Sequence, residues 1–153
     1  MALEFTLNKD SKKLENEKNT KNVTFADMDA FSNIEKYVMD CKDANLTSNS
    51  KLFLKEILSL SSMEVSFAHM EPNVKGPFFH QHKQNEELYI VLSGNGVMTV
   101  DGDDFALKEG SLVKVSPQGV RNIASGSLGL SYICIQAKQG SLEQYTMTDA
   151  TII

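Results

Sequence analysis

Two histidines and a glutamate lie within eight positions of one another near the middle of the chain. His80 and His82 are two residues apart, and Glu87 follows after a short polar link. Residues two apart on a strand point to the same face, so the two imidazoles are expected to project together. Imidazole nitrogens and carboxylate oxygens are ligands that divalent transition metals accept. The spacing therefore favours a metal site, and the alternative is an exposed His-Gln-His segment without function.

The sequence around these residues has the pattern of short strands joined by tight turns. From Glu87 to Lys138, apolar runs alternate with turn signals at residues 94–96, 101–103, 109–110, 117–119 and 125–127. Strands at such even spacing are typical of an all-β sandwich or barrel. The runs 88–92 and 130–135 are apolar on both faces, which predicts that they are covered on both sides. Glu87 opens the first run, so the link before it can fold the carboxylate back toward the two imidazoles.

The positions of these residues resemble the first motif of the cupin superfamily, approximately G(X)5HXH(X)3–4E(X)6G. His80, His82, Glu87 and Gly94 match this motif from its first histidine onward, whereas Gly76 lies closer to His80 than the motif asks. The resemblance covers roughly residues 63–138 and extends to a group of small single-domain bacterial cupins of uncharacterised function. It implies an all-β fold, the double-stranded β-helix, which is a jelly-roll-like barrel.

The second cupin motif, approximately G(X)5PXG(X)2H(X)3N, is only partly present. Gly110, Pro117 and Gly119 match it with one extra residue between the first two, and no histidine follows. The position of the missing ligand falls on Arg121 when counted from Gly110 and on Asn122 when counted from Pro117. We favour Arg121 as the inward residue, holding the anionic end of a substrate with its fork of donors. The alternative is a solvated arginine beside a turn.

Three other side chains near the motif have a functional and a structural interpretation. Glu86 competes with Glu87 as a ligand, but Glu87 fits the interval to Gly94 better. Tyr89 shares a strand face with Glu87, so its hydroxyl is a candidate for orienting a ligand or substrate, but packing in the barrel wall is the preferred interpretation. His69 is interpreted as a core histidine, not as a ligand.

The resemblance implies one divalent transition metal (Fe, Mn, Zn or Ni) bound by His80, His82 and Glu87. Two histidines and one carboxylate leave open coordination positions, as in sites for non-haem Fe(II). We therefore predict a metal-dependent enzyme, of dioxygenase type or isomerase type, acting on a small organic substrate that Arg121 would require to be anionic. The alternative is a non-catalytic small-molecule-binding cupin that has lost tight metal binding with the fourth ligand.

Length and composition predict a single cytoplasmic domain. A chain of 153 residues with 41% hydrophobic residues can bury one core. Its net charge of −5 argues against nucleic acid as a partner, and no apolar run reaches the length of a membrane span. The first residues lack the pattern of a secretory leader, and Cys41 and Cys134 do not suggest a disulfide framework. Strands that are apolar on both faces need cover, which predicts a homodimer.

The N-terminal third differs in composition from the remainder. Residues 1–22 are expected to be a mobile tail, and residues 23–153 a cupin domain with a short N-terminal helical extension. One helix is predicted from Thr24 to Met39, with Phe31, Ile34 and Val38 on one face. A second short helix is predicted from Leu52 to Leu58. We expect their apolar faces to pack against the barrel, with a partner-binding groove as the alternative.

Overall fold

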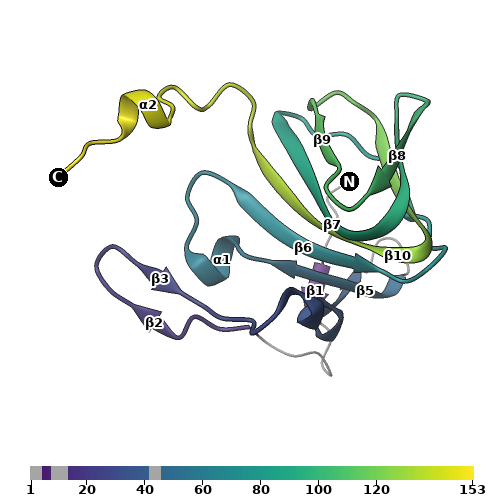
Figure 1. Cartoon of the computed structure of the whole chain (residues 1–153), viewed down its shortest axis with the longest axis horizontal. Helices are drawn as coiled ribbons and strands as arrows, with labels where there is room; N and C mark the ends of the chain where they lie inside the picture. Colours follow the sequence, from purple (N-terminus) through teal and green to yellow (C-terminus); the bar gives the residue numbers. More distant parts are fainter. Residues whose placement is uncertain (1–4, 8–13, 42–45) are drawn as a thin grey trace.

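The computed structural model describes residues 5–7, 14–41 and 46–153 of the chain, in which an eight-stranded antiparallel sheet curves into a barrel (Figure 1). The order of neighbours is β1-β4-β5-β6-β10-β7-β8, and β9 pairs with β7. The all-β double-stranded β-helix that the sequence predicted is confirmed. Its strands are β1 (Phe5–Leu7), β4 (Val38–Cys41), β5 (Leu46–Phe53), β6 (Glu64–Met70), β7 (Asn85–Val100), β8 (Asp103–Lys108), β9 (Leu112–Val115) and β10 (Arg121–Lys138).

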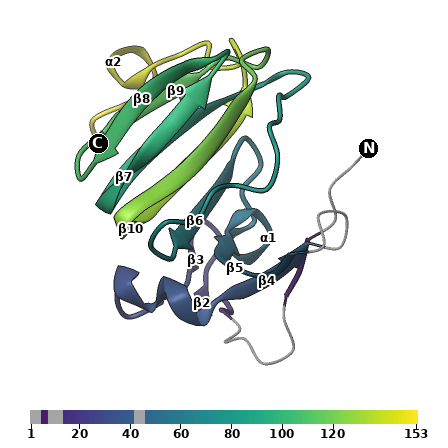
Figure 2. The ribbon, with the colours of Figure 1, turned by 90° about the vertical axis from the view of Figure 1, so that its right-hand side faces the viewer.

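Two long strands, β7 and β10, form the middle of the barrel wall and pair with each other along most of their length. The first half of β7 also pairs with β9, and its second half pairs with β8. Gly94 lies between these halves at φ +86°, and a Cβ there would collide with the carbonyl oxygen of Gly129. Only glycine satisfies both conditions, so this motif residue allows the wall to bend. Figure 2 shows β7 to β10 side by side above the N-terminal strands.

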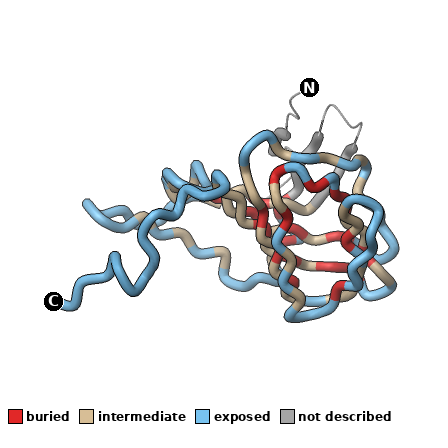
Figure 3. Tube along the Cα trace, turned by 90° about the horizontal axis from the view of Figure 1, so that it is seen from above, coloured by how far each residue is buried: buried red, intermediate tan, exposed pale blue. Residues whose placement is uncertain are grey.

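The inner face of the wall carries the main hydrophobic core. Its members alternate along each strand with exposed or half-buried residues, as a two-residue period requires. Figure 3 shows that buried segments concentrate in the barrel, whereas the C-terminal segment is exposed. The core consists of Ala68, Met70, Tyr89, Val91, Met98, Leu107, Val115, Leu130, Tyr132 and Cys134. Polar side chains that share this face are therefore inside the barrel.

The N-terminal third contains less helix than the sequence predicted. The expected helix from Thr24 to Met39 is wrong: β3 (Thr24–Phe25) pairs with β2 (Lys18–Asn19), a 3-10 helix η1 spans Phe31–Lys36, and β4 begins at Val38. Asp29 has φ +67°, which no right-handed helix accommodates. In the expected second helix only α1 (Lys55–Leu58) is helical, because Leu52 and its neighbour Phe53 pair with β6.

The same third covers the outer face of β5 and β6. Ile34, Tyr37, Leu52 and Leu54 form a second buried cluster, and the ring of Phe31 lies 5.3 Å from that of Phe67. The predicted packing of the extension against the barrel is therefore what the described residues show. Within the expected tail, β1 and β2 are strands, and residues 1–4 and 8–13 lie outside the described residues.

The chain leaves the barrel after β10 and runs through a short helix, α2 (Thr146–Asp149). This segment extends away from the barrel, as Figures 1 and 3 show. Among the described helices, none has the length and apolar character needed to cross a bilayer.

Candidate metal centre

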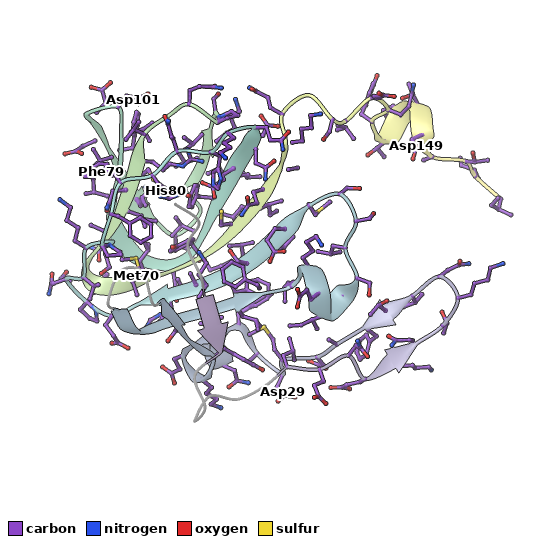
Figure 4. The ribbon with its side chains drawn as sticks, turned by 180° about the vertical axis from the view of Figure 1, so that it is seen from behind. Asp29, Met70, Phe79, His80, Asp101 and Asp149 are labelled. Atoms are coloured by element: carbon purple, nitrogen blue, oxygen red, sulfur yellow. The ribbon has the colours of Figure 1, made fainter. Side chains whose placement is uncertain are left out.

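The two histidines lie on an extended segment that crosses the start of β10. The His80 amide donates to the Arg121 carbonyl oxygen over 3.0 Å, and the Arg121 amide donates back over 2.9 Å. The His82 amide donates to the carbonyl oxygen of Pro117 over 2.9 Å. The segment is therefore held by an isolated bridge at His80 and not by the regular strand that we expected. In Figure 4, His80 lies within the curved body of strands, whereas Asp149 lies far from it.

Three side chains converge where this segment meets the start of β7. The ligand atoms of His80, His82 and Glu87 all lie within 4.8 Å of one another. His82 Nε2 lies 3.0 Å from Glu87 Oε1, and His80 Nε2 lies 3.9 Å from Glu87 Oε2. The contact between His82 and Glu87 lacks hydrogen-bond alignment, so the buried His82 Nε2 has no hydrogen-bond partner among the described residues. A buried nitrogen without a partner is costly, and a bound cation would satisfy it.

Glu87 is 4% exposed, and its two carboxylate oxygens have different surroundings. Oε2 accepts hydrogen bonds from the Tyr89 hydroxyl over 2.6 Å, from Arg121 Nε over 3.0 Å and from Arg121 Nη2 over 2.8 Å. Oε1 instead faces His82 and accepts a weak hydrogen bond from Cys134 Sγ over 3.5 Å. The protein thus fixes the carboxylate through Oε2 and leaves Oε1 on the side of His82.

Arg121 is fully buried, and the donors of its guanidinium are largely engaged. Besides its two bonds to Glu87, Nη1 donates to the carbonyl oxygens of Gly119 over 2.7 Å and Pro117 over 3.2 Å. We expected the guanidinium of Arg121 to hold the anionic end of a substrate, but its carboxylate partner is Glu87. The donors that we expected to hold a substrate anion are therefore committed to the protein itself. Arg121 stands where the cupin motif has its missing ligand, but it acts on Glu87.

Asn122, the other candidate for that position, serves the adjoining loop. Its Nδ2 donates to the carbonyl oxygens of Gly76 over 2.9 Å and Phe78 over 2.7 Å. Arg121 and Asn122 are both buried but contact different parts of the protein, as adjacent residues on a strand do. The residue beside the three candidate ligands is therefore Arg121, which is the position obtained by counting from Gly110.

Burial and neighbouring charges set the protonation of the site. Burial, assisted by the positive charges of Arg121 and Lys51, lowers the pKa of His80 to about 4 although Glu87 opposes this, so the imidazole is neutral at pH 7. Burial alone would raise the pKa of Glu87, but the contacts with His82, Tyr89 and Arg121 outweigh it and hold that pKa well below its ordinary value. A neutral imidazole and an ionised carboxylate are the forms that bind metals.

Two donors beside Glu87 stay protonated for the same electrostatic reason. Burial, followed by the charges of its neighbours, raises the pKa of Tyr89 well above its usual range. Burial and the Glu87 charge raise the pKa of the Cys134 thiol to about 12. Both groups therefore donate to the carboxylate at neutral pH.

The remaining candidates from the sequence lie outside this cluster. Glu86 is paired with Lys114 Nζ at 3.6 Å on the exposed side of the strand. His69 Nδ1 lies 2.8 Å from Ser131 Oγ, and its Nε2 lies 3.6 Å from Glu71 Oε1. Sequence reasoning missed the hydrogen bond from Cys134 and the charge of Lys51. The alternation of residues 51–54 was the available signal for Lys51, but we had placed residues 52–54 in the predicted helix Leu52–Leu58, so the strand that carries Lys51 was missed.

Comparison with known proteins agrees with this geometry. Residues 66–129 match the family model described as Cupin domain. The crystal structure of a cupin protein from Bacteroides fragilis is 40% identical, with a TM-score of 0.66 over 71% of this chain and 92% of that one. The chain belongs to the cupin superfamily.

Two further similarities are more limited. An uncharacterised protein of Methanocaldococcus jannaschii is 34% identical over 56 residues, which are 36% of this chain and 45% of that protein. A sugar phosphate isomerase of the cupin superfamily from Silicibacter pomeroyi has a TM-score of 0.52 at 18% identity, covering 60% of this chain and 59% of that one. The second similarity shows the shared fold alone.

Proposed function

We propose that this cupin is a metal-dependent enzyme that acts on a small organic substrate. His80, His82 and Glu87 would hold one divalent transition metal, with iron or manganese favoured for oxygenase-type chemistry and zinc or nickel also compatible. The observation that carries the proposal is the buried His82 Nε2, which has no hydrogen-bond partner among the described residues and lies 3.0 Å from a fixed carboxylate. A metal bound by three protein ligands supplies Lewis acidity and keeps coordination positions open.

Tyr89 and Arg121 are proposed as positioning residues. Both donate to Glu87 Oε2 and to no other carboxylate among the described residues. Partners of this kind orient a ligand carboxylate and are a normal part of a metal site. Their role is therefore to keep Oε1 directed toward His82 while Oε2 is occupied.

Metal analysis of the His82→Ala variant tests the proposal. Wild-type protein purified without a histidine tag should carry close to one equivalent of transition metal, and the variant should lose most of it. His69→Ala is the matched control, because His69 is a half-buried histidine with its own hydrogen bond outside the cluster. Circular dichroism should show both variants folded. Equal metal content in wild type and a folded His82→Ala protein would refute the ligand assignment.

One observation favours the second candidate, a non-catalytic binding protein. Arg121 already balances the Glu87 charge, and this reduces the attraction that a carboxylate exerts on a cation. If the wild-type protein stays metal-free after incubation with Fe(II), Mn(II), Zn(II) and Ni(II) in turn, that result would support this candidate. Tight binding of any one of them would support the enzyme, to be followed by tests of oxygen consumption and of isomerisation.

The proposed assembly is a homodimer. The N-terminal third covers the outer face of β5 and β6, so this face does not require a second copy. The C-terminal segment instead exposes several large apolar side chains, which a second copy would cover: Leu142, Tyr145, Met147, Ile152 and Ile153. Sedimentation at micromolar concentration should give the mass of a dimer, and removal of residues 140–153 should give a monomer. A monomeric full-length chain would refute the assembly.

A further inference from the structure

A groove of about 320 Å³ lies on the outside of the barrel, where the loop between β3 and η1 meets α1 and β6. Its volume is in the range of small-molecule pockets, which begins at about 300 Å³. The groove shares no residue with the metal centre. Figure 4 shows Asp29, which lines the groove, well away from His80. It is therefore a second concave site, separate from the barrel interior.

The floor of the groove is a part of the outer hydrophobic cluster that the protein leaves open. Leu54 is buried in that cluster, whereas Leu14, Met28, Leu58 and Phe67 pack against it and are only partly buried. All five residues line the groove. Apolar surface that is open to water gains free energy when an apolar group covers it. The floor therefore favours an occupant with an apolar body.

Two aromatic rings form part of the wall. Phe31, the first residue of η1, is 57% exposed, and its ring lies 5.3 Å from that of Phe67 at an angle of 48°. Both residues line the groove. The face of an aromatic ring is electron-rich and attracts an ammonium group. An exposed ring in this position thus favours an occupant that is aromatic, cationic or both.

Two carboxylates give the groove its charge. Asp27 and Asp29 line it and are both exposed, and no lysine, arginine or histidine is among the described residues that line it. Asp27 Oδ1 accepts a hydrogen bond from the Asp29 amide over 2.8 Å, which fixes the first carboxylate beside the second residue. A carboxylate has about four acceptor sites, so this bond leaves Asp27 able to accept from a ligand. A cation complements this charge.

We infer that this groove binds a small hydrophobic amine, with its apolar body on the open cluster and its ammonium group beside Asp27 and Asp29. The same ammonium group is attracted by the ring face of Phe31. An apolar cavity of about 150 Å³ holds benzene, so a groove of this volume suits a ligand of roughly ten to twelve non-hydrogen atoms. The inference goes beyond the proposed metal-dependent function and does not rest on it.

The C-terminal segment of a second copy is the other occupant that the molecule offers. It exposes apolar side chains that would suit the floor. However, residues 139–153 contain Glu143 and Asp149 and neither lysine nor arginine. These carboxylates would meet Asp27 and Asp29, which carry the same charge and would repel them. The amine is the better complement because it matches the floor and the charge together.

An NMR titration of ¹⁵N-labelled protein with 2-phenylethylamine at pH 7 tests the inference, with 2-phenylethanol as the neutral analogue and 3-phenylpropanoate as the anionic one. We expect the amine to bind with a Kd of about 1 mM or tighter and to shift the amide signals of residues 26–31 and 54–58. The alcohol should bind more weakly, and the acid most weakly of the three. High salt should weaken binding of the amine but not of the alcohol, because it screens exposed charges.

Asparagine substitutions remove the two charges and keep the local geometry. Asp27→Asn keeps an oxygen that accepts the Asp29 amide, and Asp29→Asn suits a backbone at φ +67°. Each should weaken amine binding about two- to fivefold, and the double variant about tenfold, with alcohol binding unchanged. Phe31→Leu should weaken the amine more than the alcohol. Asp103→Asn is the matched control, since it removes an exposed aspartate of β8 outside the groove, and it should bind the amine like wild type.

Three results would overturn the inference. The first is equal affinity for the amine and the alcohol, and the second is equal amine affinity in the double variant and in Asp103→Asn protein. The third is an amine affinity that rises when residues 140–153 are removed, because the C-terminal segment of a second copy would then be the occupant of the groove. His82→Ala protein should bind the amine like wild type, so the outcome is independent of the metal centre.

Discussion

Two cationic side chains enter the same barrel, and their surroundings differ. Arg121 on β10 is fully buried and donates four hydrogen bonds, two to Glu87 and two to backbone carbonyls. Lys51 on β5 is half-buried, lies over an aromatic ring and lines a cavity. One cation is part of the framework of the site, and the other borders space that a ligand can fill.

This difference follows from the chemistry of the two cations. The planar fork of an arginine suits a fixed set of acceptors, whereas an ammonium on a flexible stem can follow a ligand. Arg121, the only arginine in the sequence, occupies the position at which the cupin motif has a histidine ligand. Its role toward Glu87 was invisible in the sequence because the two residues are 34 positions apart.

Substitution of Arg121 should have the largest effect. Arg121→Met leaves the Glu87 carboxylate buried without its cation, and we expect the free energy of unfolding to fall by about 3–5 kcal/mol. Urea denaturation monitored by circular dichroism measures this change. A loss below about 1 kcal/mol would mean that Arg121 contributes no more stability than an exposed ion pair does, and the contrast with Lys51 would disappear.

The double variant Arg121→Met with Glu87→Gln is the control for that experiment. Removing both charges avoids the uncompensated buried carboxylate, so part of the lost stability should return. No recovery would mean that Arg121 stabilises the barrel chiefly through the carbonyl oxygens of Pro117 and Gly119.

Tyr89 offers a smaller perturbation of the same carboxylate. Tyr89→Phe removes a 2.6 Å hydrogen bond to an ionised oxygen but keeps the ring, and should cost about 1.5–3 kcal/mol. The comparison variant is Tyr132→Phe, whose hydroxyl forms no such bond within the described residues and should therefore cost less. Equal losses in the two variants would contradict the assignment of Tyr89 to the framework.

The dependence of stability on pH tests His80, the candidate ligand whose pKa is lowered by burial and by the charges of Arg121 and Lys51. The pKa of His80 is about 4 in the folded chain and about 6.5 when unfolded, so the unfolded chain binds more protons between these values. Stability should therefore fall as the pH drops from about 6.5. The lowered pKa of Glu87 adds most of its own loss below about 4.5, its ordinary value. Burial raises the pKa of Glu64, but that carboxyl titrates alike in wild type and in His80→Gln, so the difference between the two proteins reports on His80. Denaturation at pH 7, 6 and 5 should show a smaller slope in His80→Gln than in wild type, and equal slopes would contradict the assignment.

The sequence predicted the barrel well because its signals are local. Strands 88–92 and 130–135 lie within β7 and β10, and the predicted turns at 101–103, 109–110 and 117–119 fall at strand ends. The turns predicted at 94–96 and 125–127 are wrong, because these residues continue the long strands β7 and β10. The N-terminal third was predicted poorly, because Phe31, Ile34 and Val38 have helical spacing while Asp29 breaks the helix and Val38 pairs with Ser50 of β5. Apolar spacing alone does not distinguish these outcomes.

The site was predictable to the extent that its residues are neighbours in the sequence. His80, His82 and Glu87 lie within one motif, and the structure brings their ligand atoms within 4.8 Å. The pairing of Glu87 with Arg121 and the position of Lys51 depend on contacts between distant strands. No pattern within a single strand contains that information.

Lys51 provides the smallest expected effect on stability and the sharpest contrast with Arg121. Lys51→Met removes a charge that is half exposed and a contact with the Phe53 ring, while it keeps the length of the apolar stem. Contacts of this kind contribute about 1 kcal/mol or less, so the midpoint of urea denaturation should stay near that of wild type. A loss comparable to that of Arg121→Met would show that both cations belong to the framework of the barrel. A midpoint near that of wild type would separate the two cations, because it would show that the stability of the barrel depends on Arg121 and not on Lys51.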